Sequence, residues 1–317
     1  MTRDWEQQFR DWGKPPPASE EERCERTISE IRTAIKSDHT LNRRNIDVFV
    51  QGSYKNGTNV KTESDVDTGS VCKDSFIIGF PPGVSGAAQQ ETFKISTGII
   101  DASYHYSQYK NELGSALTSY FGRDYVKRGN KAFHINETRR RVDADVAPFF
   151  EYRRYTANRE YHEGVALYTD KESKLIVNWP KQHYDNGCQK NSETGKRFKA
   201  ITRCVKSLAI EMQGKRIPES NVPGFLIECL LWNVPSNLFN HENYSDDVKS
   251  CLLHCYHATK SDDTCKDWCE VSGMKWLFVG QDNWTRDQAN KFVLSAWLYV
   301  GIWNNALLSR YKLNSDG

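Results

Sequence analysis

The stretch Val48-Phe49-Val50-Gln51-Gly52-Ser53, followed after residues 54–64 by Asp65-Val66-Asp67, decides the fold. The apolar run at 46–50 predicts a short strand, and residues 64–72 predict a second one. The Gly, Asn and Thr residues between them predict a loop over 52–63. Because side chains alternate along a strand, Asp65 and Asp67 are expected on the same face, where they can share cations.

The glycine turn and the aspartate pair together indicate phosphoryl or nucleotidyl transfer. Taken alone, an aspartate pair is more often a solvated acidic turn, and Gly-Ser is more often an ordinary turn after a strand. In combination, Gly52 lets the backbone approach a triphosphate, and Ser53 offers hydroxyl and N–H donors to it. Magnesium prefers oxygen ligands and is commonly held by a few carboxylates plus substrate phosphates. We therefore expect Asp65 and Asp67 to hold divalent ions.

A third carboxylate is expected on a neighbouring strand, since two ions need to be bridged. The segment Arg141-Val142-Asp143-Ala144-Asp145-Val146-Ala147-Pro148 provides two candidates. Asp143 and Asp145 share one strand face, so spacing alone does not choose between them. The alternative for either carboxylate is an ion pair with one of the arginines at 139–141, which would neutralise its charge.

A basic helix is predicted over 195–213. Lys199, Arg203 and Lys206 stand at i, i+4 and i+7, so they are expected to form one stripe. Nucleotide phosphates carry charge that needs cationic partners in a cleft of low dielectric constant. The stripe is therefore a candidate phosphate-binding surface, and the alternative is an ordinary solvated helix face.

The predicted elements indicate an α+β fold with two domains. Helices are expected at 1–13, 19–37, 106–121, 195–213, 222–232, 245–259 and 284–308, and one or two further strands within 131–150, ending at Pro148. The polar segment from 151 to 191 carries the turn signals Asn178-Trp179-Pro180 and Asp185-Asn186-Gly187. We expect a mixed α/β lobe at 1–160 and a mainly helical lobe at 161–317.

Composition excludes some function classes. The 317 residues include 43 basic and 41 acidic side chains, a formal charge of +2. This lacks the basic excess expected of a protein that grips long nucleic acid. No window approaches the roughly 20 apolar residues of a membrane span, and the N-terminus resembles no signal peptide. We expect no membrane partner and a cytoplasmic location.

Nine cysteines are expected to be reduced thiols. Four of them, Cys251, Cys255, Cys265 and Cys269, form a C-x3-C, x9, C-x3-C pattern that resembles a metal site. A gap of three residues also places each pair on one helix face, where a buried thiol behaves as a small apolar group. Structural zinc pairs more often use tighter spacings, so packing is the favoured interpretation.

The segments 51–60 and 64–67 resemble the bacterial cyclic oligonucleotide synthases related to cyclic GMP-AMP synthase, called CD-NTases. Asp145-Val146-Ala147-Pro148 resembles the family's third-aspartate strand, in which the aspartate stands three residues before a proline. This resemblance, rather than spacing, selects Asp145 over Asp143. It continues through 178–187, 197–206 and 223–229, covers most of residues 50–232, and is most like the E clade.

The resemblance implies a polymerase-β-like nucleotidyltransferase lobe, a helical lobe and an active site in the cleft between them. It implies that Asp65, Asp67 and Asp145 hold two Mg²⁺ or Mn²⁺ ions. Gly52 and Ser53 would contact the triphosphate, with Gln51 assisting. Further nucleotide-binding candidates are Lys199, Lys206, which matches the family's phosphate-binding lysine, and Asn178, whose amide can read a base edge. For Asn178, a turn-forming role before Trp-Pro is the alternative.

Two residues depart from the family pattern. Thr68 replaces the aliphatic residue that is common after the second aspartate, and this is expected to be harmless. Gly224 stands where relatives often have a phosphate-binding serine. Ser220 or a backbone N–H is the expected substitute.

The implied function is synthesis of a cyclic di- or trinucleotide second messenger from nucleoside triphosphates in anti-phage (CBASS-type) defence. A separate effector protein would sense the product. A ubiquitin-transfer-like enzyme acting on Gly317 is a further candidate partner, and a frayed tail is the alternative. Other functions left open are a linear nucleotidyltransferase acting on oligonucleotides or RNA, and a catalytically silent nucleotide-binding module. Three retained carboxylates, which repel one another without metal, argue against the silent module.

Overall fold

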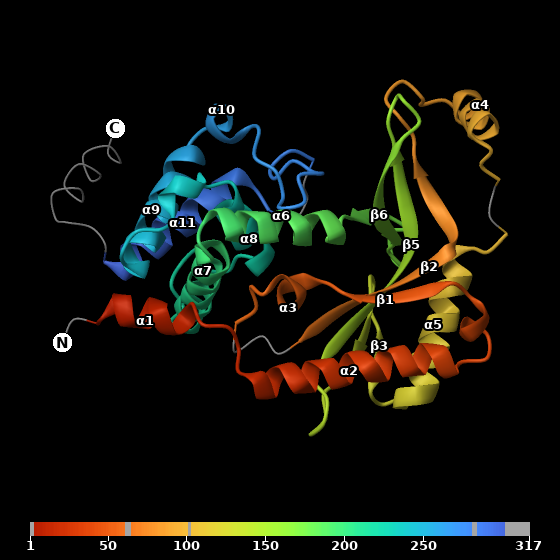
Figure 1. Cartoon of the computed structure of the whole chain (residues 1–317), viewed down its shortest axis with the longest axis horizontal. Coiled ribbons are helices and arrows are strands. Elements are labelled where there is room, and N and C mark those ends of the chain that lie inside the picture. The colour runs from red at the N-terminus through yellow and green to blue at the C-terminus, as the bar shows by residue number, and fades with distance from the viewer. Residues whose placement is uncertain (1–2, 61–64, 101–102, 281–283, 302–317) are drawn as a thin grey trace. The chain divides into compact units, whose positions relative to one another are not determined.

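The computed structural model describes residues 3–60, 65–100, 103–280 and 284–301, and Figure 1 shows its elements. The chain divides into a sheet unit, residues 16–55 and 61–181, and a helical unit, residues 1–15, 56–60 and 182–317. The expected boundary at 160 differs from this division, because strands after 160 complete the sheet. The N-terminal residues also join the helical unit, which a single cut in the sequence cannot represent.

In the part of the sheet unit that the structure describes, the sheet has seven strands. They are β1 (Ile46–Val50), β2 (Val66–Gly79), β3 (Val126–Arg128), β4 (Phe133–Ile135), β5 (Ala144–Tyr155), β6 (Tyr161–Tyr168) and β7 (Leu175–Asn178). Their order is β1-β2-β5-β4-β3, while β6 pairs with β5 and β7 pairs with β6. β2 and β5 run parallel, and the other neighbours are antiparallel. The strand predicted at 46–50 is confirmed, and the one predicted at 64–72 is confirmed from Val66 and continues to Gly79.

β5 continues through Pro148, so the expectation that it ends there is wrong. The N–H of Val66 donates to the carbonyl of Asp143, and backbone groups alternate between the two edges of a strand. Pro148 therefore faces the edge away from β2. Along that edge β4 pairs only as far as Val146 and β6 begins at Phe150, so no neighbouring strand needs the missing proline N–H.

Four helical segments accompany the sheet: α2 (Ala18–Ser37), η1 (Leu41–Arg43), α4 (Ala87–Thr97) and α5 (Tyr106–Phe121). α2 and α5 were expected, and they cover one face (Figure 1). Their apolar side chains pack with Cys72 and Val146. The alternate residues Val71 and Ala147 belong to a separate cluster, so they lie on the opposite face.

The loop expected over 52–63 is only partly a loop. The short helix α3 (Gly52–Asn56) follows β1 almost directly. Gly52 has a φ of +69°, which turns the chain sharply out of the strand. Residues 61–64 lie outside the described residues.

The helical unit contains α1 (Trp5–Trp12), α6 (Pro180–Glu193, from Gln182 onward), α7 (Arg197–Gly214), α8 (Gly224–Trp232), η2 (Ser236–Leu238), α9 (Tyr244–Ala258), α10 (Asp262–Cys265) and α11 (Arg286–Val300). The predicted helices at 195–213, 222–232 and 245–259 are confirmed, and the one at 1–13 is confirmed over Trp5–Trp12, while residues 1–2 lie outside the described residues. The last predicted helix is confirmed as far as Val300, and residues beyond Gly301 lie outside the described residues. α6 is not predicted from the sequence, because Asp185-Asn186-Gly187 is typical of a turn. In the structure Gly187 is buried, and the Asn186 amide donates to the Val271 carbonyl at 2.8 Å.

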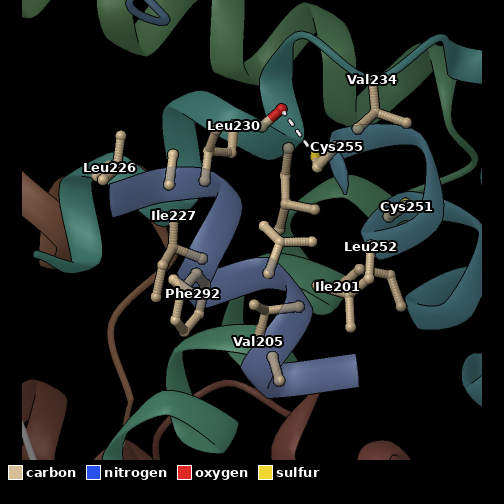
Figure 2. Packing of buried hydrophobic residues seen from close by; sticks show 14 of the residues in the cluster. Ile201, Val205, Leu226, Ile227, Leu230, Val234, Cys251, Leu252, Cys255 and Phe292 are labelled. Carbon is tan, nitrogen blue, oxygen red and sulfur yellow. Dashed lines mark hydrogen bonds between the residues drawn. The ribbon is translucent and has the colours of Figure 1, made fainter. Parts of the chain in front are cut away.

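Helices α7, α8, α9 and α11 enclose one apolar core, and Figure 2 shows part of it. Cys251 and Cys255 are fully packed in it, and the Cys255 thiol donates to the Leu230 carbonyl at 3.7 Å. Cys265 is also buried, whereas Cys269 is half-buried. The interpretation of these cysteines as packing groups is confirmed for the three buried ones. All nine cysteines are free thiols.

A buried polar network holds residues 56–60 against the helices. The Thr58 hydroxyl donates to Glu228 at 2.7 Å, and His183 Nε2 lies 2.9 Å from the same carboxylate. Lys206 Nζ lies 3.3 Å from Glu228 and 3.2 Å from Thr58. Burial favours a raised pKa for Glu228, but the charge of Lys206 and the hydrogen bonds from His183 and Thr58 outweigh it and lower that pKa to about 2.

Arg203 makes a second attachment in the same unit. Its guanidinium donates to the carbonyls of Gly13 and Gly57, and only 8% of the residue is exposed. Two separate chain segments are thereby joined to α7. Among the described helices, none combines the length and the apolar character needed to cross a membrane.

Replacing Glu228 by Gln should destabilise the protein, because Lys206 would stay buried without its counter-charge. The free energy of unfolding at pH 7 should fall by about 3 kcal/mol. The folded pKa, about 2, lies below the ordinary 4.5, so this contribution is complete above about pH 4.5 and is lost as the pH falls toward 2. Urea unfolding of wild type and E228Q at pH 7 and pH 3.5 measures both effects.

The exposed Glu242 in the same unit provides the control, and E242Q should match wild type at both pH values. A difference between wild type and E228Q that does not shrink at pH 3.5 would contradict the assigned pKa.

Candidate active site

Asp67 and Asp145 are direct neighbours across the parallel strands β2 and β5, where the register pairs one with the other. Both lie on the strand face that carries Val71 and Ala147, opposite the helices. Asp65 precedes β2, and the next residue, Val66, is held to β5 by its N–H bond to Asp143. Three carboxylates from two distant segments are therefore brought to one region of the sheet unit.

Gly52 lies directly against Asp67. A Cβ atom at this glycine would stand 2.2 Å from Asp67 Oδ2, far inside contact distance. The positive φ gives a second, independent reason for glycine here. The N–H of Gln51 donates to the Asp67 carbonyl at 2.9 Å, which fixes the start of the turn, and Ser53 follows as a half-buried residue of α3.

The surroundings of Asp143 and Asp145 differ. Asp143 Oδ1 accepts the N–H of Glu137 at 2.7 Å, so this carboxylate caps its own loop. The side chain of Asp145 is 52% exposed, and its Oδ1 lies 3.0 Å from His134 Nδ1. Asp145 therefore has a structural partner and still presents itself to solvent. This supports Asp145 as the third carboxylate, a choice that spacing left open.

The site concentrates negative charge. Burial, followed by the charges of Asp143 and Asp145, raises the pKa of Asp65 above its ordinary value. Within the described ranges, no three His, Cys, Asp or Glu side chains close around a point tightly enough to hold a cation alone. Magnesium usually draws part of its ligand shell from water and phosphate, so an open carboxylate set beside a glycine turn fits such an ion.

The predicted basic residues lie in the helical unit, and they differ in availability. The guanidinium of Arg203 is hydrogen-bonded to backbone carbonyls, so the prediction that it belongs to a phosphate-binding stripe is wrong. Lys206 is buried in the network around Glu228. Lys199 is half-buried, with Nζ at 3.4 Å from Cys188 Sγ and 5.5 Å from the centre of the Tyr184 ring.

The remaining predicted positions are less informative. Asn178 ends β7, pairs with Val165 and is half-buried. Ser220 is buried and its hydroxyl donates to the Ile217 carbonyl at 2.7 Å, so it is a poor substitute for a phosphate-binding serine. Gly224 begins α8, and a Cβ there would meet Lys206 Cε at 3.3 Å. Gly317 lies outside the described residues.

Sequence reasoning missed His134. This residue lies on β4 directly opposite Asp145, and its imidazole reaches both Asp145 and Asp143. A histidine between Phe133 and Ile135 carries no signal in the linear sequence. Only the antiparallel register of β4 with β5 brings it to the carboxylates.

Comparison with known proteins gives matches along most of the chain. Residues 185–301 match the family model of the cGAS/DncV-like nucleotidyltransferase C-terminal helical domain. The "Cyclic dipyrimidine nucleotide synthase CdnE" of Cecembia lonarensis is 37% identical over 303 residues, covering 95% of this chain and 99% of that relative. The protein of the same description from Legionella pneumophila is 36% identical over 306 residues, with the same two coverages.

A solved structure agrees with these relatives. The Rhodothermus marinus CdnE c-UMP-AMP synthase, determined with Apcpp and Upnpp, superimposes with a TM-score of 0.81 at 28% identity. The match covers 93% of this chain and 96% of that one. The expected α+β, polymerase-β-like fold is thereby confirmed. The chain belongs to the CD-NTase family of nucleotidyltransferases, in its CdnE clade.

Proposed function

We propose that this enzyme joins two nucleoside triphosphates into a cyclic dinucleotide and releases pyrophosphate. The observation that carries the proposal is the pairing of Asp67 with Asp145 across β2 and β5, with Gly52 packed against Asp67. This arrangement suits nucleotidyl transfer, in which the protein supplies positioning and charge for a phosphate group. The similarity to cyclic nucleotide synthases over 95% of the chain supports ring closure rather than linear extension.

Pyrimidine nucleotides are the proposed substrates. Both relatives at 36–37% identity are described as cyclic dipyrimidine nucleotide synthases, whereas the synthase described as forming cyclic dipurines, from Elizabethkingia meningoseptica, is 30% identical. Asn178, at the end of β7, is the proposed reader of a base edge through its amide.

The residues that would hold Mg²⁺ or Mn²⁺, two ions in the proposed complex, are Asp65, Asp67 and Asp145. When bound, such ions supply charge stabilisation to the reacting phosphate. The missing side chain at Gly52 lets the backbone of the turn lie directly against Asp67, and Ser53 offers its hydroxyl and N–H to a phosphate. Asp145, with half of its side chain exposed, accepts the proton of the attacking ribose hydroxyl.

Lys199 and Lys206 are the proposed cationic partners of the triphosphate, assisted by Gln51. Lys206 is held by Glu228 and Thr58 in this structure, so it would be shared between the network and a phosphate. Keeping these partners while binding a phosphate costs less free energy than leaving the Lys206 ammonium buried without any partner.

The product would act as a second messenger in CBASS-type anti-phage defence and be sensed by a separate effector protein. The cytoplasm is the proposed compartment, because nucleoside triphosphates are available there and all nine thiols are unpaired. Attachment through Gly317 by a ubiquitin-transfer-like partner belongs to the same proposal.

Purified protein incubated with all four nucleoside triphosphates and Mg²⁺ or Mn²⁺ should give a phosphatase-resistant product in mass spectrometry. D65A/D67A should lower the yield by at least about 1,000-fold, because two of the three carboxylates are gone. D124A removes an exposed aspartate of the same unit and should leave the yield unchanged. A ladder of linear products would replace the proposal by a polymerising activity, and no product with any metal would favour a silent binding module.

Replacing Asp145 should lower kcat more than replacing Asp143 does. D145N should lower kcat by about 100-fold or more, since it removes charge where the reacting groups bind. D143N should act mainly through the loop that Asp143 caps at Glu137, with a lower melting temperature and a smaller loss of kcat. The opposite ranking of the two kcat values would exchange their roles.

Gly52→Ala should nearly abolish product formation, because the added Cβ displaces Asp67. Gly98 is a matched control: its φ of +68° resembles the +69° of Gly52, but its Cβ would meet nothing within 4 Å. G98A should therefore show the strain of about 1 kcal/mol in its melting temperature and keep its activity. If G52A and G98A were equally active, the contact of the added Cβ with Asp67 would have no effect on catalysis, and only the backbone strain would distinguish G52A from wild type.

A further inference from the structure

His134 has a place in the sheet that no feature of the fold requires. Its strand neighbours Phe133 and Ile135 are buried in the core beneath α2 and α5, so its own side chain projects from the opposite face. That face carries Asp67 and Asp145. Forty per cent of the His134 side chain is exposed, which makes a core-packing role insufficient as an explanation.

The contact of His134 with Asp145 is the shorter of its two carboxylate contacts. Nδ1 lies 3.0 Å from Asp145 Oδ1, whereas Nε2 lies 3.5 Å from Asp143 Oδ1. Only the first distance lies within the usual range of an N–H···O hydrogen bond. An ionised carboxylate only accepts, so Nδ1 is the donor in this bond.

We propose that His134 is a positioning residue that sets the orientation of the Asp145 carboxylate toward the reacting groups. The imidazole engages Oδ1, and the buried side chains of Phe133 and Ile135 fix the backbone of β4 on either side of it. The exposed carboxylate is thus restricted in rotation, and its second oxygen is directed to a ligand. The inference rests on the proposed function, in which Asp145 is one of three carboxylates at the reaction centre.

The expected loss on replacing His134 follows from residues in other proteins that hydrogen-bond to a metal-binding side chain and orient it. Loss of such a partner typically weakens metal affinity or activity by about 10- to 100-fold. A purely structural role of His134 would instead lower the stability of the sheet unit and reduce all activities together.

Two replacements separate the contacts of the imidazole. The amide nitrogen of Asn occupies the position of Nδ1, and that of Gln approaches the position of Nε2. H134N should therefore restore the bond to Asp145, while H134Q should reach toward Asp143. H134A removes both, and H162A, on an exposed position of β6 in the same unit, is the matched control.

The experiment measures kcat, KM and melting temperature for the full-length variants, and Mn²⁺ binding by electron paramagnetic resonance with and without an α,β-methylene nucleoside triphosphate. H134A should weaken Mn²⁺ binding by about tenfold and lower kcat at limiting Mn²⁺ by a similar factor, with KM for the nucleotide within about twofold. H134N should recover both quantities, and H134Q and H162A should behave like H134A and wild type respectively.

Several outcomes overturn the inference. They are unchanged Mn²⁺ binding and kcat in H134A, rescue by H134Q as good as rescue by H134N, or losses that follow the melting temperature across all variants. Product formation by wild type alongside any of these leaves the proposed function intact and removes only the role of His134. If wild type forms no product but H134A still weakens Mn²⁺ binding with rescue by H134N, the proposed function fails and the positioning role stands.

Discussion

The parallel pairing of β2 with β5 is the constraint on which the candidate site depends. It brings a segment near residue 66 beside one near residue 145 and sets their register, so that Asp67 meets Asp145 across the pair. A slip by one residue would turn either aspartate toward the apolar core under α2 and α5. The buried residues on both faces hold this register. The core that stabilises the sheet therefore also specifies which carboxylates come together.

Grouping carboxylates has a cost in the absence of cations. The neighbouring charges, together with burial, raise the pKa of Asp65, which means that its ionised form is disfavoured there. Gly52 turns the chain beside Asp67 with a positive φ that glycine adopts without steric cost. Carboxylates that are costly to ionise tend to persist where a ligand compensates the cost, and their grouping at one end of β2 agrees with the proposed phosphate- and metal-binding role.

In the helical unit, the buried charges of Lys206 and Glu228 compensate each other. Lys206 and Glu228 are both almost fully buried, yet each is satisfied by the other and by Thr58 and His183. The network ties residues 56–60, which continue from α3, to helices far away in the sequence. Lys206, a proposed phosphate ligand, is thus also part of the packing of this unit.

Local sequence determined most of the elements and singled out the candidate carboxylates. The apolar run before Gly52, the aspartate spacing and the helical periodicities predicted β1, β2, α2, α5 and the helices α7 to α9, because these signals depend on neighbours a few residues apart. Only the tertiary structure gave Asp143 and Asp145 different surroundings, placed His134 beside them, and brought the Arg203 guanidinium into hydrogen bonds with the carbonyls of Gly13 and Gly57. It also carried β5 through Pro148 and extended the sheet beyond residue 160. Strand register, burial and long-range partners settle these points, and they depend on residues distant in the chain that no local pattern encodes.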